Sequence, residues 1–288
     1  MKPCQGPDRN TKKPVFKMPR NAVDCHAHVF GPQARFPYSE ARSYTPEDCS
    51  VEQYIALLDT LGIDRGVIVH GGAHGTDNAA TLDGLDRMQG RARAILVTPP
   101  GMSLAERQAL HVRGVRGYRM STVVSGGVSF DALEQLAGEA KELGWHLLLH
   151  FHASHELVEV ANRLRALDCD YVLDHLARIR AEEGVASEAF QTVLSLLKTG
   201  RCWVKLASLY RLSNEAYPHR DMLPMIHAVI AARPDRMIWG TNWPHPIHPG
   251  QMPNDGDLVD LIPLWAPDPQ TQQRILVDNP SSLYGFDL

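Results

Sequence analysis

Short apolar runs alternate with amphipathic stretches along the 288-residue chain. Each apolar run is typical of a buried strand, and the stretch after it carries apolar residues at the spacing of one helix face. Eight such units follow one another. The predicted strands span 22–30, 65–72, 91–100, 115–120, 145–151, 170–176, 201–208 and 236–242.

The intervening stretches predict helices over 51–62, 78–90, 103–114, 129–144, 156–168, 188–200, 221–234 and 257–267. Several end in glycine, where a left-handed cap is expected, as at Gly62 and Gly114. Strand–helix alternation favours parallel pairing with helical crossovers, and eight units favour a closed (β/α)8 TIM barrel. We therefore predict a single α/β domain over 21–288, preceded by an irregular N-terminal arm over 1–20.

Composition excludes several classes of partner. The net charge of −4 favours neither nucleic acid nor an anionic membrane surface. No apolar segment reaches the roughly 18 residues of a membrane span. The arm has no apolar core of a secretory signal, and the five scattered cysteines form no Cys-x-x-Cys pair, so we expect a cytoplasmic protein. The sequence does not decide between a monomer and a homo-oligomer.

Histidines concentrate where TIM barrels carry their chemistry. Active sites lie at the C-terminal ends of barrel strands, and nine of the fourteen histidines fall at or just past predicted strand ends. His26 and His28 share one strand face, which favours metal coordination or substrate binding. A single strand-end histidine is more often a packing residue, and we expect that of His70, His74 and His155.

Three arginines follow predicted strands: Arg119, Arg178 and Arg211. No matching carboxylates stand at those strand ends. Guanidinium groups gathered at one barrel mouth favour bidentate binding of a substrate carboxylate or sulfonate. Lys205, on the seventh strand, is expected to form a structural ion pair.

Four stretches together resemble the amidohydrolase superfamily, in particular the 2-pyrone-4,6-dicarboxylate lactonase group. They are DCHAHVFGP, LDHLARI, WGTNWPHP and ILVDNPSSLYGF, and HGTDNAATLD (74–83) is a further match. The resemblance runs from residue 21 to 288. It implies a lactonase acting on a small anionic lactone in bacterial aromatic catabolism, usually without a metal.

The resemblance also implies site residues. Those expected to act in catalysis are His26, His28, His175, Asn242 and His245. Those expected to contact the substrate are Tyr44, Arg119, Arg178 and Arg211, together with His150, which stands where the group has a tyrosine.

Two departures from the group point to a different lactone. The strand-8 residue of the group is an aspartate, its presumed general base, whereas this chain has Asn242. An amide cannot accept a proton at neutral pH. A second arginine expected soon after Arg119 is absent from the stretch MSTVVSGG, 120–127. We expect a relative of pyrone dicarboxylate, such as sulfomuconolactone or a sugar-acid lactone.

Three explanations of Asn242 remain open at this point. A histidine acts as the base while Asn242 orients the water or the lactone carbonyl. A substrate hydroxyl attacks instead of water, giving the lactone isomerisation of galactarolactone isomerase. Asn242 is an engineered change that traps a substrate. We favour hydrolysis.

A metal-dependent reaction is a further hypothesis. Zinc-dependent aromatic-acid decarboxylases share the barrel and the His-x-His, but they need a strand-8 carboxylate. In this chain Zn²⁺ or Mn²⁺ would depend on imidazoles alone, those of His26, His28, His150 and His175. Without an anionic ligand, and beside three arginines, we expect no tightly bound metal and no other cofactor.

Overall fold

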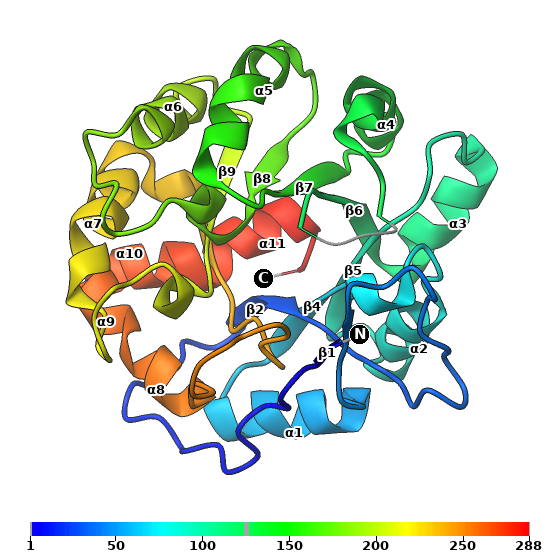
Figure 1. Ribbon diagram of the computed structural model, residues 1–288, viewed down its shortest axis with the longest axis horizontal. Coiled ribbons are helices and arrows are strands. Elements are labelled where there is room, and N and C mark those ends of the chain that lie inside the picture. Colours follow the sequence, from blue (N-terminus) through cyan, green and yellow to red (C-terminus); the bar gives the residue numbers. More distant parts are fainter. Residues whose placement is uncertain (1, 124–126, 288) are drawn as a thin grey trace.

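Eight parallel strands form the centre of the computed structural model, which describes residues 2–123 and 127–287 (Figure 1). Helices surround the strands in a ring, which confirms the predicted single-domain (β/α)8 barrel. In spatial order the strands are β2 (Val23–Ala27), β4 (Arg65–Val69), β5 (Ala92–Leu96), β6 (Val115–Ser121), β7 (His146–His150), β8 (Tyr171–Leu173), β9 (Cys202–Leu206) and β10 (Met237–Trp239).

The helices follow the predicted units closely up to the eighth. They are α1 (Val51–Leu61), α2 (Ala79–Arg87), α3 (Leu104–Arg113), α4 (Leu133–Lys141), α5 (Ser154–Ala166), α6 (Glu188–Leu197) and α7 (Leu223–Ala232). The single helix predicted over 257–267 is instead two, α8 (Asp255–Asp260) and α9 (Ile262–Trp265). Pro263 lies in the first turn of α9, where its missing N–H is tolerated, and it would break a continuous helix.

Shorter elements complete the chain. Among the described residues, 3₁₀ turns lie at η1 (Gly72–His74), η2 (Phe130–Ala132), η4 (Leu209–Arg211), η5 (Arg220–Met222) and η6 (Pro234–Arg236), and η3 (Asp174–Arg178) is a left-handed turn. After the eighth unit come α10 (Pro269–Gln273), the π turn η7 (Arg274–Asp278) and α11 (Asn279–Tyr284). None of the helices in the described part of the chain is long and apolar enough to span a membrane.

The N-terminal arm is not wholly irregular. Its strand β1 (Lys2–Pro3) pairs in parallel with β3 (Tyr44–Thr45), in the loop after β2. Farther along, the backbone N–H groups of Lys12 and Phe16 donate to Asn254 and Asp260, at the start and end of α8. The arm therefore joins the loop that carries Tyr44 to the segment that begins α8.

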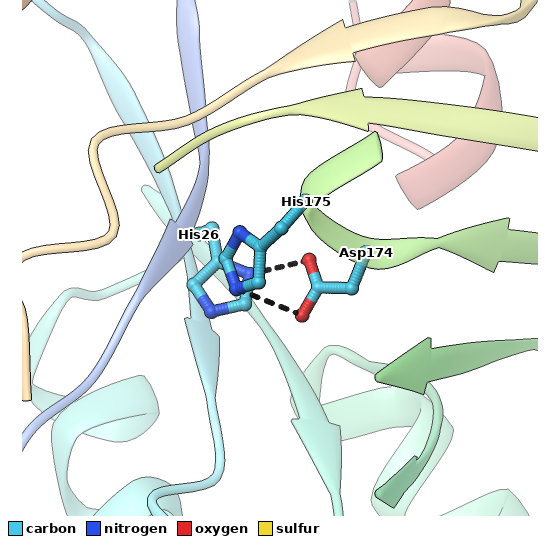
Figure 2. A group of neighbouring side chains, drawn as sticks. All are labelled: His26, Asp174 and His175. Carbon is cyan, nitrogen blue, oxygen red and sulfur yellow. Dashed lines mark ion pairs between the residues drawn. The ribbon is translucent and has the colours of Figure 1, made fainter. Parts of the chain in front are cut away.

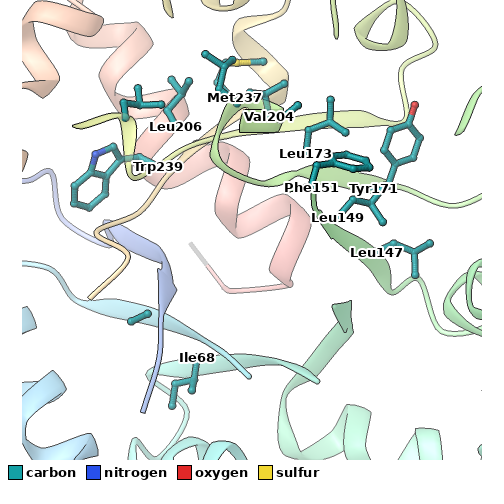
Figure 3. Close-up of a cluster of buried hydrophobic side chains, with 14 of the residues drawn as sticks. Ile68, Leu147, Leu149, Phe151, Tyr171, Leu173, Val204, Leu206, Met237 and Trp239 are labelled. Carbon is teal, nitrogen blue, oxygen red and sulfur yellow. The ribbon is translucent and has the colours of Figure 1, made fainter. Parts of the chain in front are cut away.

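Two apolar layers, one on each side of the strands, form the core. Alternate strand residues such as Leu147 and Leu149 belong to the outer layer between strands and helices (Figure 3). Leu148 belongs to the inner layer with Val67 and with Tyr284 of α11. Since the Tyr284 carbonyl accepts hydrogen bonds from arginines at the start of β5 and β6, α11 closes the N-terminal end of the barrel. The opposite end is left for a site.

The barrel closes between β2 and the segment after β10. Asn242 donates its backbone N–H to the carbonyl of His26 at 2.7 Å, and His28 donates to the carbonyl of Trp243 at 2.8 Å. A Cβ on Gly240 would lie 2.7 Å from the backbone nitrogen of His26, so only glycine permits this approach. This seam places His26, His28 and Asn242 beside one another.

Candidate active site

A cavity of about 420 Å³ opens at the C-terminal ends of the strands. Eight of the ten predicted site residues line it: His28, Tyr44, Arg119, His150, His175, Arg178, Arg211 and Asn242. His26 and His245 are fully buried beneath its wall. The lining also contains His152, Tyr210 and His248, to which the sequence analysis gave no role. Residues 124–126, in the stretch that lacks the expected second arginine, lie outside the described part of the chain.

Two of these residues are placed by a left-handed turn directly after β8. His175, Leu176 and Ala177 have φ of 50°, and Arg178 has φ of 63°. Each non-glycine residue in this conformation costs about 1–2 kcal/mol. Leu176 and Ala177 are fully buried, and this packing holds the turn in place. Strain concentrated in this way marks a functional segment, because the turn directs both His175 and Arg178 into the cavity.

A chain of hydrogen bonds fixes the protonation of His26 and His28. Nδ1 of His28 lies 2.8 Å from the carbonyl of Val69, so Nδ1 carries the proton and Nε2 accepts. Nε2 of His26 lies 3.2 Å from that acceptor and therefore donates to it. Nδ1 of His26 then accepts from the ammonium of Lys205 at 3.1 Å. Both imidazoles are neutral in this arrangement, and burial lowers their pKa values well below the usual range.

Asp174 lies at the centre of a buried group with His26 and His175 (Figure 2). Its carboxylate oxygens are 3.2 Å from Nδ1 of His26 and 3.4 Å from Nε2 of His175. Lys205 is 3.6 Å away, which agrees with the expected structural ion pair. Although burial opposes ionisation, the ammonium of Lys205 holds the pKa of Asp174 well below its usual range. Burial lowers the pKa of His175 to about 3.

This group differs from the set of imidazoles that was expected to hold any metal. The potential ligand atoms of His26, Asp174 and His175 lie within 4.8 Å of one another, whereas four imidazoles without a carboxylate were expected. An anionic ligand is therefore present. The sequence placed Asp174 at a strand end, but it could not show that its side chain turns towards His26.

Arg119 is buried and anchored in the cavity wall. One Nη donates to the carbonyl of His70 at 2.9 Å, and the other donates to Nδ1 of His150 at 3.0 Å. Nε2 of His150 must then carry the ring proton. Burial, followed by the charge of Arg119, lowers the pKa of His150 well below its usual range.

Arg178 and Arg211 complete a positive side of the cavity. Arg211 donates to the carbonyl of Pro246 at 2.9 Å, and Nε of Arg178 is buried with no hydrogen-bond partner. Within residues 2–123 and 127–287, neither these two nor Arg119 forms an ion pair with a carboxylate. The three guanidinium groups are thus available to an anion.

A second buried group lies behind the cavity wall near Asn242. The hydroxyl of Tyr210 is 2.8 Å from Nδ1 of His245, and Nε2 of His245 is 3.2 Å from a carboxylate oxygen of Asp255. Nδ2 of Asn242 donates to the same hydroxyl at 3.4 Å. The sequence analysis singled out His245 and Asn242 but assigned no role to Tyr210 or Asp255. No local signal connects residues 45 positions apart across two loops.

The histidines expected to be packing residues, His70, His74 and His155, lie outside the cavity lining, as do four further histidines that the sequence analysis did not discuss. His70 contacts Thr81 and the carbonyl of Gly75, and His74 contacts the carbonyl of Pro37. Trp145 donates to His111, and His146 packs against Tyr284. His219 and His227 contact backbone carbonyls near the surface.

Comparisons with known proteins agree with this geometry. The sequence is 38% identical over 288 residues to a 4-sulfomuconolactone hydrolase of Rhizobium radiobacter, covering 98% of this chain and 96% of that one. It is 42% identical to a 2-pyrone-4,6-dicarboxylate hydrolase of Comamonas testosteroni (96% and 93% covered). It is 29% identical to a D-galactarolactone isomerase of Agrobacterium fabrum (94% and 92% covered).

A solved structure of similar fold carries a related name. A probable 2-pyrone-4,6-dicarboxylic acid hydrolase from Acinetobacter baumannii, with citric acid bound, superposes with a TM-score of 0.80 at 27% identity. The match covers 92% of this chain and all of that one. A family model described as amidohydrolase matches residues 23–286. The chain therefore belongs to the amidohydrolase family.

Proposed function

We propose that this protein hydrolyses a small lactone that carries a carboxylate or sulfonate group. The observation that carries the proposal is the gathering of Arg119, Arg178 and Arg211 around one cavity, unpaired with any carboxylate of the described residues. Guanidinium groups bind such anions through paired hydrogen bonds. The similarity to a 4-sulfomuconolactone hydrolase and a 2-pyrone-4,6-dicarboxylate hydrolase supports the same reaction class.

The cavity offers the parts that ring opening needs. The arginines would hold the anionic substituent and so fix the orientation of the ring. His150 lines the cavity, and its Nε2–H would donate to the lactone carbonyl oxygen, which gains negative charge in the tetrahedral intermediate. Attack by water then breaks the ring C–O bond and yields a hydroxy acid, which releases one proton to solvent.

A divalent cation would be held by His26, Asp174 and His175, whose donor atoms converge. The two carboxylate oxygens of Asp174 have no hydrogen-bond partner among the described residues. When bound, it would polarise the lactone carbonyl or activate water. Lys205 already places a positive charge 3.6 Å from Asp174 and donates to the only free lone pair of His26. We therefore propose that hydrolysis proceeds without a tightly bound metal.

The test is a panel of carboxylated and sulfonated lactones assayed in ¹⁸O-labelled water. Label in a ring-opened acid is the expected result, whether or not the protein has been treated with chelator and freed of metal. An unlabelled isomeric lactone would instead support the isomerase reaction named for the Agrobacterium fabrum relative, which the amide at Asn242 favours. One tight metal equivalent by elemental analysis, with activity lost on its removal, would contradict the metal-free proposal.

We also propose a cytoplasmic location. Cys25, Cys49, Cys169 and Cys202 are buried free thiols, as is usual in a reducing compartment.

A further inference from the structure

Hydrolysis needs a group that accepts a proton from water, and most residues of the cavity wall are poor candidates. Arginine and the Asn242 amide have no basic atom at neutral pH. In His28, Nδ1 donates to Val69 and the Nε2 lone pair is taken up by His26. The Nδ1 of His150 accepts from Arg119, and its Nε2 carries the proton.

His175 and His248 are weak bases for a different reason. Nδ1 of His175 faces the carbonyl of Ala207 at 3.2 Å, and burial lowers the pKa of this imidazole to about 3. Burial, followed by the charge of Arg211, lowers the pKa of His248 to about 4. A general base works best when its pKa is near the working pH, so neither imidazole is well suited.

Tyr210 has an environment unlike that of any of these groups. It lines the cavity, and its hydroxyl is 2.8 Å from Nδ1 of His245. His245 and Asp255 are almost completely buried, 3.2 Å apart, and directly behind the phenol. Nε of Arg211 at 3.3 Å and Nδ2 of Asn242 at 3.4 Å also point at the hydroxyl oxygen, and both can only donate. An oxygen surrounded by donors is stabilised as a phenolate.

Charges around the phenol act in the same direction. Burial alone would raise the pKa of Tyr210, but Arg211 and His245 outweigh it and lower the pKa to about 8. Burial alone would lower the pKa of His245, but Tyr210 and Asp255 outweigh it and raise the pKa to about 9. His248 packs edge-on against Tyr210, with ring centroids 5.1 Å apart, and the charge of Arg178 also interacts with the phenol.

We infer that Tyr210 is the general base of the reaction, and that His245 and Asp255 are positioning residues that stabilise its phenolate. This inference rests on the proposed lactone hydrolysis. With a pKa of about 9, His245 already carries a proton on Nδ1 near neutral pH and donates it to the Tyr210 oxygen, and Asp255 stabilises this imidazolium. Tyr210 becomes a phenolate by losing its own proton to solvent. The phenolate then takes a proton from water as the water oxygen bonds to the lactone carbonyl carbon. When the ring C–O bond breaks, Tyr210 returns that proton to the leaving ring oxygen.

The same geometry gives Asn242 a role. Because its Nδ2 is directed at Tyr210, its Oδ1 is left to accept a hydrogen bond from the attacking water. Asn242 lines the cavity next to Tyr210, so one amide can contact both the base and the water. An amide is suited to this task because it donates to the phenolate, which a carboxylate cannot do.

The first test is Tyr210→Phe, which removes the hydroxyl and keeps the ring. We expect kcat to fall by about 10²–10⁴-fold, the usual contribution of a general base, with KM changed by less than about threefold. The matched control is Tyr118→Phe, whose hydroxyl contacts Glu139 outside the cavity and whose loss should leave kcat unchanged. Retention of wild-type kcat by Tyr210→Phe would overturn the inference.

The second test is Asp255→Asn, which separates a positioning role from simple structural support. Without the carboxylate, His245 holds its proton less tightly and stabilises the phenolate less. The acid limb of kcat/KM, expected near pH 8 in the wild type, should therefore move to higher pH, with activity largely recovered at alkaline pH. A uniform loss of activity at every pH, with the acid limb of kcat/KM unmoved, would count against this role of His245 and Asp255.

A spectroscopic titration keeps the inference separate from the proposed function. In the wild type, ultraviolet difference spectra should show one tyrosine ionising near pH 8, and this signal should be absent from Tyr210→Phe. If the wild type opens none of the lactones, the proposed function fails, and the titration alone decides whether Tyr210 is an activated phenol. Absence of the early ionisation would overturn the inference in either case.

Discussion

Residue 242 shows how one side chain decides the chemistry of this site. Its backbone adopts a left-handed conformation, with φ of 66°, and its N–H is fixed to His26 across the barrel seam. The side-chain amide therefore has a fixed direction, towards Tyr210. Asparagine is among the residues that tolerate this backbone conformation best. Aspartate tolerates it as well, so the backbone does not account for the amide.

Replacing Asn242 with aspartate should move the pH dependence of the reaction. A carboxylate at this position can take the proton from water itself, and its reference pKa is about 3.9. The acid limb of kcat/KM should then fall from near pH 8 towards the carboxylate range, and activity at mildly acidic pH should rise roughly tenfold or more. An unchanged limb in the pH profile would contradict this expectation. A nearly inactive wild type made fully active would instead identify Asn242 as a trapping substitution.

Removal of a single guanidinium group tests the anionic substrate. Each of Arg178→Ala and Arg211→Ala should lower kcat/KM by roughly ten- to a hundredfold, because a charge-assisted contact contributes about 1.5–3 kcal/mol. The exposed Arg165→Ala, on α5, should have no effect. Steady-state kinetics with the anionic lactone and with its neutral methyl ester provide the measurement. For Arg178→Ala, a similar loss with both substrates would rule out recognition of the anion by this arginine. Arg211→Ala also removes a donor to Tyr210 and should slow the reaction of both substrates.

At the scale of elements, a buried carboxylate adds to the backbone hydrogen bonds that close the barrel seam. Asp24 of β2 accepts hydrogen bonds from the backbone N–H and the hydroxyl of Thr241, at 2.9 and 2.7 Å, and from Tyr54 at 3.0 Å. Burial raises the pKa of Asp24 to about 6 despite these donors. The position of Asn242, next to Thr241, thus depends on the hydrogen bonds that this carboxylate accepts.

Thr241→Val, which keeps the shape and removes one donor, should lower the free energy of unfolding by about 1–3 kcal/mol near neutral pH. The folded pKa of Asp24 already lies above its unfolded value, and loss of a donor raises it further. The free energy of unfolding therefore declines as pH rises through the folded pKa of Asp24, and it should decline by more in the variant than in the wild type. Denaturant unfolding at pH 5 and pH 8 should show a larger deficit at pH 8. Thr192→Val on α6 is the control, and a deficit independent of pH would refute the role of Asp24.

On the scale of the whole molecule, the N-terminal arm connects distant parts of the site. Asn254 accepts from the backbone of Lys12 and donates to Asp8 and to the carbonyl of Asn10. It also caps α8 through the backbone N–H of Gly256. The next residue is Asp255, the partner of His245. The arm thus fastens both the start of α8 and, through β1, the loop that carries Tyr44.

Asn254→Ala should release this connection without unfolding the barrel. Loss of the helix cap costs about 1 kcal/mol, a small part of the stability of a domain this large. Amide hydrogen exchange should accelerate at least about tenfold over residues 8–16, because these amides exchange when the arm opens locally. The amides of β5 and β7 should stay protected. Mass spectrometry of exchanged peptides measures this, with the exposed Asn162→Ala as the control. Unchanged exchange in the arm would show that other contacts hold it.

Local sequence patterns were enough to predict the architecture and most of the cavity lining. The spacing of apolar residues within one segment already indicates which of its faces is buried. The alternation of strands and helices is compatible with few topologies. Because parallel barrel strands end at one face, a polar residue at a strand end is already placed in the site. Eight predicted residues, among them His28, Arg119 and His150, line the cavity for this reason.

Only the tertiary structure decided how those residues act on one another. The left-handed turn after β8, which carries His175, is unfavourable locally and is held by the packing of Leu176 and Ala177. The contacts of Asp174 with Lys205, and of Tyr210 with His245 and Asp255, join segments that periodicity treats as unrelated. Loop conformation and burial from all sides set these distances and the pKa values that follow from them. Neither is encoded in the pattern of any single segment.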